Sequence, residues 1–466
     1  MLFNSLIFFI FLPIVFGGYW LLKERKWQNV WLLLASYVFY GWWDWRFLFL
    51  IAACSGINFW AGQYIAKTEE SWKRRIALSA CVAVCIGALC AFKYYNFFAE
   101  SLCAMFGWDP TSITFRIVLP VGISFFTFQA LSYTIDIALG KLKPTKSWVE
   151  FFTFIAFFPQ LVAGPIERAS NLLPQFQKDR RFDFNAAAHG LSLMAYGLFK
   201  KMVVADTLAS YIDVVYLHPN AYPSLTCIIA AVFFSIQIYC DFSGYSDVAR
   251  GVARLFGFEL MVNFNRPYLS TSVGDFWRNW HISLSTWFKD YVYIPLGGNR
   301  VTMVKWIRNT MIVFLLSGLW HGAAWTFVAW GALHGIFLVV EGLMRRIHKQ
   351  AEGLFARVLG IVTTDILVCL AWIFFRARSF EDARSVFAAI FTSGTDLTTT
   401  RLFATLGPVS FLFSLIAIGL LFLSYATPRD CRFKTLRSHW LFTVVCIAAI
   451  LIFGAPVGGE FIYFQF

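Results

Sequence analysis

Long runs of apolar residues, separated by short polar segments, dominate the chain. A helix needs about 20 residues to cross a hydrocarbon core roughly 30 Å thick, so runs near that length predict membrane-spanning helices. The candidate spans, some of them short or interrupted, are residues 3–22, 28–43, 46–66, 76–98, 117–139, 149–163, 189–208, 224–242, 309–325, 327–344, 358–375, 409–425 and 440–456. The pattern predicts an all-α polytopic membrane protein.

Two stretches break this pattern. Residues 158–177 contain too much Pro and Gly for a continuous helix, and in residues 241–300 apolar positions alternate with Asp, Arg and Asn. Irregular backbone at membrane depth is tolerated only where it is buried in protein or lines a water-filled cavity. Both stretches are therefore predicted to be re-entrant or half-membrane elements around a cavity.

Composition strengthens the membrane prediction. Only 14% of the 466 residues are charged, compared with roughly 25% in soluble domains. The net charge of +13 comes from Lys and Arg clusters between apolar runs, which is typical of cytoplasmic membrane loops and argues against nucleic-acid binding. The cysteines form no CxxC pair and lie mostly in or beside apolar runs, which indicates small buried hydrophobic residues rather than disulfides or a metal site.

The basic clusters also predict an orientation. They lie at residues 23–26, 67–75 and 141–146, whereas the turns at residues 41–45 and 101–114 contain no Lys or Arg. The positive-inside rule then places the three basic loops in the cytoplasm and the N-terminus outside, with the first apolar run retained as a span. Because no internal repeat or low-complexity linker divides the chain, residues 1–466 are predicted to form one domain.

Residues 270–335 concentrate the ionisable side chains of an otherwise apolar chain. Such side chains cost about 2.5 kcal/mol or more at membrane depth, so they usually pair or take part in function. His321, in SGLWHGAAW, follows Ser317 by one helical turn and is a candidate general base. Gly318 and Gly322 would let a substrate approach. A histidine hydrogen-bonded between packed helices fits the residue equally well, and this alternative stays open.

His281 lies in DFWRNWHISLSTWFKDY, which is predicted to form one helix lying partly in the membrane interface. On that helix Ser285 shares a face with His281, and Arg278 shares a face with Lys289. These two cations, together with Arg300, could meet the phosphates of an anionic donor such as coenzyme A. The alternative is that they extend to lipid headgroups.

Other kinds of site find little support. His321 and His334 would lie on widely different faces of a shared helix, and no HExxH motif or Cys/His cluster is present, so no metal site is predicted. The chain also lacks the GxSxG, GxxxxGK[ST] and GxGxxG motifs, which removes the basis for hydrolase, ATPase or dinucleotide chemistry.

An aromatic tail motif, FIYFQF, occupies residues 461–466 after a run of helix-breaking residues. It could anchor at the membrane interface. Alternatively, it enters the cavity or docks on a partner, with Tyr463 as a transient acyl carrier, since tyrosine forms covalent intermediates when a base is adjacent.

Four segments carry a resemblance to a known family. They are FFPQLVAGPIERASNLLPQF, YCDFSGYSDVARGVARLFGFEL, NFNRPYLSTSVGDFWRNWHISLSTWFKDYVYIPLGGNR and SGLWHGAAWTFVAWGALHG. The chain resembles the bacterial membrane-bound O-acyltransferases (MBOAT), in particular the branch that O-acetylates alginate, peptidoglycan and related polysaccharides.

The resemblance implies a ring of about 11–13 transmembrane or re-entrant helices around a central funnel in the bacterial inner membrane. It implies that His321 is the essential histidine and that His281 lines the same site. It further implies acetyl-CoA as the cytoplasmic donor, Tyr463 as the acyl carrier, and a separate extracytoplasmic SGNH-type transferase or esterase that completes transfer to a polysaccharide.

Two alternatives remain. Another acyl group could be transferred, as in D-alanylation of teichoic acids from a carrier protein, and a basic cytoplasmic face suits either donor. A transporter or flippase would belong to a different class. It would predict paired broken helices in two related halves, and the sequence shows no internal symmetry of that kind.

Overall fold

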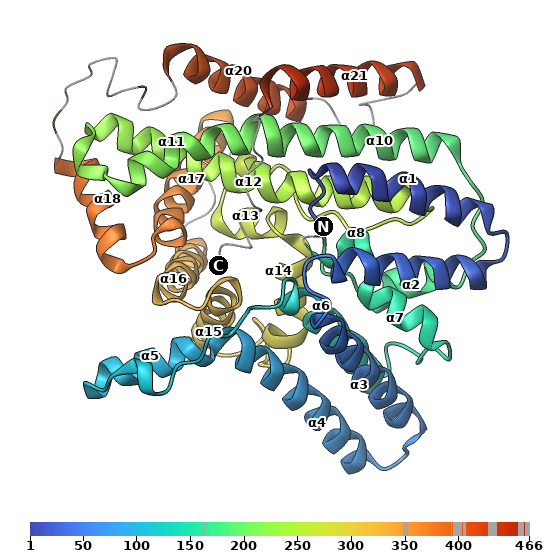
Figure 1. Cartoon of the computed structure of the whole chain (residues 1–466). Coiled ribbons are helices and arrows are strands. Elements are labelled where there is room, and N and C mark those ends of the chain that lie inside the picture. Colours follow the sequence, from blue (N-terminus) through green and yellow to red (C-terminus); the bar gives the residue numbers. More distant parts are fainter. Residues whose placement is uncertain are drawn as a thin grey trace. The chain divides into compact units, whose positions relative to one another are not determined.

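The computed structural model describes residues 1–162, 164–347, 353–392, 394, 403, 407–426, 436–454 and 461. Every regular element among them is helical, and none is a β-strand (Figure 1), so the all-α prediction is confirmed. Contacts divide the chain into two compact units, Met1–Met194 with Ser246–Met261, and Ala195–Tyr245 with Val262–Phe466. The prediction of one domain, and that of a ring around a funnel, stay predictions.

The first unit is built from the N-terminal helices. They are α1 (Leu6–Leu21), α2 (Arg25–Gly41), α3 (Phe47–Lys67), α4 (Ser71–Leu89), the π-helical turn η1 (Cys90–Tyr94), α5 (Tyr95–Phe106), the 3-10 turn η2 (Pro110–Ser112), α6 (Ile123–Ala138), α7 (Trp148–Ala156), α8 (Phe158–Leu161), α9 (Ala169–Phe176) and α10 (Phe184–Leu198). Helix α6 packs against α3 and α4 and is buried along most of its length. Its polar side chains find partners within the unit: Gln129 donates to the Phe154 carbonyl at 2.6 Å and Thr134 to Asn58 Oδ1 at 2.7 Å.

The second unit contains the C-terminal elements. They are the π-helical turn η3 (Phe199–Ala205), α11 (Asp206–Leu217), η4 (Pro219–Ala221), α12 (Ser224–Leu255), η5 (Pro267–Leu269), α13 (Val273–Asn279), α14 (Ile282–Phe288), the π-helical turn η6 (Lys289–Tyr293), α15 (Met303–His321), α16 (Trp325–Ile347), α17 (Leu354–Arg376), α18 (Phe380–Thr392), α20 (Gly407–Ala426) and α21 (Leu436–Phe453). Three boundaries separate the units: two fall within α10 and α12, and the third lies between Met261 and Val262.

Apolar helices of membrane-spanning length are present, as predicted. Within the described part of the chain, five are long and apolar enough to cross a membrane: Phe47–Lys67, Ser71–Phe106, Ser224–Leu255, Trp325–Ile347 and Leu354–Arg376. The chain is therefore a multi-pass membrane protein. Ser71–Phe106 is longer than the predicted span because the π-helical turn η1 joins α4 to α5 without a break.

The two stretches predicted to be irregular have different outcomes. Residues 158–177 are broken into the short helices α8 and α9, as expected. Residues 241–255 instead continue α12, so the prediction of irregular backbone is wrong there. Asp241 pairs with Lys201 at 2.8 Å and Asp247 with Arg250 at 3.2 Å, and these pairs let a regular helix carry its charges. Beyond Leu255 the expected breaks appear.

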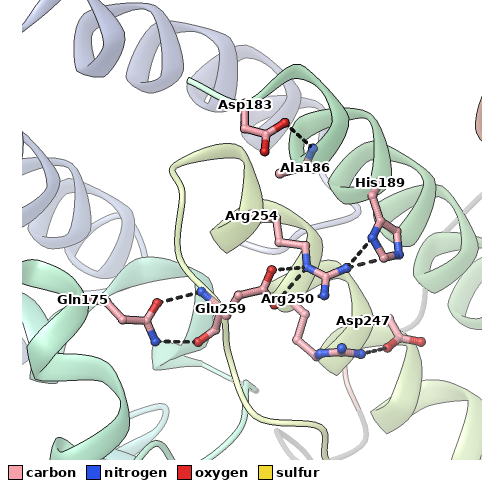
Figure 2. A network of polar contacts seen from close by, with 8 residues as sticks. All are labelled: Gln175, Asp183, Ala186, His189, Asp247, Arg250, Arg254 and Glu259. Carbon is pink, nitrogen blue, oxygen red and sulfur yellow. Dashed lines mark hydrogen bonds and ion pairs between the residues drawn. The ribbon is translucent and has the colours of Figure 1, made fainter. Parts of the chain in front are cut away.

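Side chains hold α9 to the irregular segment that follows α12 in the first unit (Figure 2). The Gln175 amide accepts from the Glu259 backbone N–H at 2.8 Å and donates to the Glu259 carbonyl at 2.9 Å. The Glu259 carboxylate pairs with Arg254, whose Nη1 lies 2.8 Å from His189 Nδ1. The Gln175 side-chain amide thus pairs with both backbone groups of Glu259, as a neighbouring β-strand would. The irregular segment after α12 therefore keeps hydrogen-bond partners at this residue.

Candidate active site

His321 ends α15 and is buried against aromatic rings. Its imidazole centroid lies 4.9 Å from that of Trp330 on α16 and 5.4 Å from that of Phe375 on α17. The neighbouring Trp320 ring lies at 5.0 Å. Three helices of the second unit therefore fix the position of this ring.

Glycines along α15 bring this helix into close contact with α16 (Figure 1). A Cβ atom on Gly318 would lie 2.3 Å from the Phe327 carbonyl oxygen, and one on Gly331 would lie 2.2 Å from the Phe314 carbonyl oxygen. A Cβ on Gly322 would lie 2.2 Å from the Phe327 ring. The prediction that Gly318 and Gly322 leave room for a substrate is wrong, because α16 fills that space. The glycines instead press His321 against α16.

His281 lies at a break in the chain, and the prediction of one helix through this region is wrong. Helix α13 ends at Asn279, and α14 begins at Ile282. His281 itself has the left-handed conformation φ 42, ψ 55 and is fully buried. A non-glycine residue in this conformation costs about 1–3 kcal/mol, and such strain is often found at functional sites.

The segment around Asn263 explains the break. The Asn263 carbonyl accepts from the Ile282 N–H at 2.9 Å, and Asn263 Oδ1 accepts from Ser283 Oγ at 2.7 Å. The Asn265 N–H donates to the Asn279 carbonyl at 2.9 Å. These contacts satisfy backbone groups on both sides of His281 that a continuous helix would have used.

The structure brings His281 and His321 together from these separate elements. Their ring centroids lie 6.2 Å apart, and the Trp320 ring lies 5.7 Å from His281. On its other side His281 contacts the Phe242 ring of α12 at 4.6 Å. Two imidazoles, each able to take or donate a proton, therefore lie side by side in an apolar setting.

A cavity of about 410 Å³ lies beside these elements in the second unit. Arg278 of α13 and Lys289 of η6 both line it, although they do not belong to one helix. Ser317, one turn before His321, also lines the cavity, whereas Arg300 does not. The arrangement offers an apolar chamber with two cations, which suits a flexible ligand with an anionic end.

A buried ionic cluster was missed by the sequence reasoning. Lys201 Nζ lies 2.8 Å from both Asp206 Oδ1 and Asp241 Oδ1, and the three side chains are 4%, 5% and 3% exposed. The adjacent Lys200 donates to Ser243 Oγ at 2.9 Å. Two lysines inside the predicted span 189–208 were the available signal, since intramembrane charges are rare and usually functional.

The first residue of the aromatic tail packs against α12, next to a residue that contacts His281. Phe461 is fully buried, and its ring lies 4.4 Å from that of Tyr245 and 5.7 Å from that of Phe242. Phe242 is also the residue that contacts His281. Tyr463 lies outside the described residues.

The candidate site lies in the part of the chain that matches a known protein family. The model of MBOAT, the membrane-bound O-acyltransferase family, matches residues 141–381, which include both histidines and the three candidate cations. The chain is 42% identical to the probable alginate O-acetylase AlgI of Azotobacter vinelandii, over 84% of this chain and 79% of that protein. It is 35% identical to the peptidoglycan O-acetyltransferase of Helicobacter pylori, over 83% and 79% of the two chains. A teichoic acid D-alanyltransferase of Bacillus subtilis is 28% identical, over 56% of this chain and 69% of its own.

Proposed function

Because the chain belongs to the membrane-bound O-acyltransferase family, we propose that this multi-pass acyltransferase moves acetyl groups for O-acetylation of an extracytoplasmic polysaccharide. The observation that carries the proposal is the buried pair His281–His321 beside a cavity with two cations. The names of its relatives, an alginate O-acetylase and a peptidoglycan O-acetyltransferase, support polysaccharide as the acceptor class.

Acetyl-CoA is the proposed donor, reaching the site from the cytoplasm. A volume of about 410 Å³ falls within the usual range for small-molecule sites. Arg278 and Lys289 would bind the donor's phosphates, and the thioester would extend toward Ser317 and His321. Arg300 would meet the donor outside the cavity.

His321 is the proposed general base. It takes the proton of the acceptor hydroxyl, whose oxygen then bonds to the thioester carbonyl carbon while the carbon–sulfur bond breaks. His321 returns the proton to the coenzyme A thiolate, so the acetyl group becomes an ester and free thiol leaves. His281 stabilises the negative charge that develops on the carbonyl oxygen.

Tyr463 is the proposed first acceptor. Support comes from Phe461, which packs against Phe242 beside His281. Tyr463 follows Phe461 by two residues in the sequence, and two residues of extended chain span at most about 7 Å. The acetyl ester then passes to a separate SGNH-type transferase or esterase on the outer face of the bacterial inner membrane, where the N-terminus also lies.

The test of this function is the substitution His321→Ala. Loss of a general base reduces turnover by about 10²–10⁴-fold, so acetylation of the polysaccharide should fall to background while the protein still folds in the membrane. His218→Ala, which changes an exposed histidine of the same unit, is the matched control and should acetylate normally. Normal acetylation by His321→Ala would refute the proposed base.

Donor binding separates acetyl transfer from D-alanyl transfer. Purified protein should bind radiolabelled acetyl-CoA, and Arg278→Ala with Lys289→Ala should weaken this binding at least 10-fold, since each removes a phosphate contact. Lys305→Ala removes a nearby cation that does not line the cavity and should bind normally. Failure of the unaltered protein to bind acetyl-CoA would instead favour a carrier-protein donor.

A further inference from the structure

His334 has no part in the chemistry described so far, yet it is fully buried on α16. Trp277 Nε1 lies 3.3 Å from His334 Nδ1. An indole N–H can only donate, so Nδ1 must accept, and the imidazole is neutral with its hydrogen on Nε2. The contact therefore fixes both the charge and the tautomer of His334.

Aromatic rings surround the rest of this imidazole. The ring centroids of Trp330, Trp277 and Phe276 lie 4.9, 5.1 and 6.4 Å from that of His334. Among the described residues, His334 Nε2 has no hydrogen-bond acceptor. Burying a polar group in this state is unfavourable, and phenylalanine at the same place would not carry that cost. The role of histidine at this position therefore lies in Nδ1, the nitrogen that accepts from Trp277.

Trp277 connects His334 with the cavity. Its side chain lines the cavity together with Phe314 and Leu338, whereas His334 does not line it. Trp330 contacts both His334 and the proposed base His321, and its ring centroid lies 4.9 Å from each imidazole centroid. His334 thus lies behind the cavity wall and one ring away from the proposed base.

We propose that His334 is a positioning residue: its neutral imidazole holds the Trp277 indole in place as the cavity wall and holds Trp330 against His321. The identity of the ligand in the cavity rests on the proposed function, whereas the contact between His334 and Trp277 does not. Without that acceptor, Trp277 can rotate into the cavity, and the donor has to displace it.

Kinetics of acetyl transfer test this role. His334→Phe keeps an aromatic ring but removes the acceptor, and it should raise KM for acetyl-CoA about 10-fold with a smaller fall in kcat. His334→Asn keeps an acceptor near the Nδ1 position and should recover most of the lost affinity. In His334→Phe the pH profile of kcat should stay that of the unaltered protein, because the phenylalanine ring still packs against Trp330 and so leaves the surroundings of His321 unchanged. A wild-type KM in His334→Phe, or equal effects of Phe and Asn, would overturn the proposal.

A double-mutant cycle provides the second measurement. Trp277→Phe removes the donor, so adding it to His334→Phe should lower the melting temperature no further than the larger single change does. Additive losses would show that the two residues act independently. This readout needs no substrate: if the unaltered protein transfers no acetyl group, the proposed function fails while the cycle still decides on the contact. If His334→Phe does not fold, His334→Leu, which also removes the acceptor, takes its place in the cycle with Trp277→Phe.

Discussion

His281 shows at the scale of one residue how stability and chemistry conflict in this site. Its left-handed backbone is one that L-residues other than Asn and Asp seldom adopt, and its ring is fully buried. Asn263 accepts hydrogen bonds from Ile282 and Ser283, the two residues after His281, and these bonds hold that conformation. The break directs the imidazole toward His321, which a continuous helix through residues 273–288 would not do.

Glycine and alanine at position 281 should separate the two effects. Both substitutions remove the proposed oxyanion donor and should reduce acetyl transfer about 10²–10³-fold. The free energy of unfolding of His281→Gly should nevertheless exceed that of His281→Ala by about 1 kcal/mol, because only glycine adopts φ 42 without strain. His281→Gly should therefore unfold at the higher temperature. Thermal unfolding in detergent measures the difference.

At a control position the difference in stability between glycine and alanine should have the opposite sign. His439 lies in the regular helix α21, where glycine should be less stable than alanine by about 0.5–1 kcal/mol. If His281→Ala proved as stable as His281→Gly, the backbone at position 281 would not be strained.

The sequence predicted the two histidines but not how they meet. His321 was identified from its motif and from the cost of burying a charge, while its pairing with His281 came from the family resemblance. The break at Trp280–His281 could not be predicted because its cause, Asn263, is distant along the chain. Lys201 was missed because the span containing it, residues 189–208, was predicted from the length of its apolar run.

At the scale of elements, the seam between α15 and α16 decides where His321 lies. The lengths of two adjacent apolar runs predicted spans at 309–325 and 327–344, and both helices exist with shifted ends, at Met303–His321 and Trp325–Ile347. The length of an apolar run does not state which face of the helix meets its neighbour. Gly318 and Gly322 were therefore assigned to a substrate, although Gly318 is a point where the backbones of the two helices touch, opposite Gly331.

Gly331→Ala should destabilise the protein and displace His321. The added Cβ would lie 2.2 Å from the Phe314 carbonyl oxygen, and backbone cannot move aside as a side chain can. Overpacking of this kind costs about 1–3 kcal/mol, so both the melting temperature and acetyl transfer should fall. Gly87→Ala is the matched control, because a Cβ there meets nothing within 4 Å. That variant should be unchanged or slightly more stable, and a similar loss in both would exclude steric contact as the cause.

Over the whole chain, the sequence predicts class better than arrangement. The apolar runs suffice for an all-α multi-pass protein, because each helix satisfies its own backbone and the signal is local. Charged positions misled the prediction in α12, where Asp241 finds Lys201 at a distance of 40 residues along the chain. Long-range pairing of this kind decides whether a charge breaks a helix or is carried by it.

The tail is a further long-range case, because Phe461 meets residues of α12 that lie more than 200 positions earlier. If this contact positions Tyr463 for acetylation, Phe461→Ala should greatly reduce acetyl label on the protein while leaving acetyl-CoA binding intact, since the cavity lining does not include Phe461. Tyr463→Phe should remove the label altogether. Phe391→Ala, which changes an aromatic residue 76% exposed in the same unit, should label normally. Full labelling of Phe461→Ala would show that the contacts of Phe461 with Phe242 and Tyr245 do not position the tail for acetylation, even if Tyr463 is the carrier.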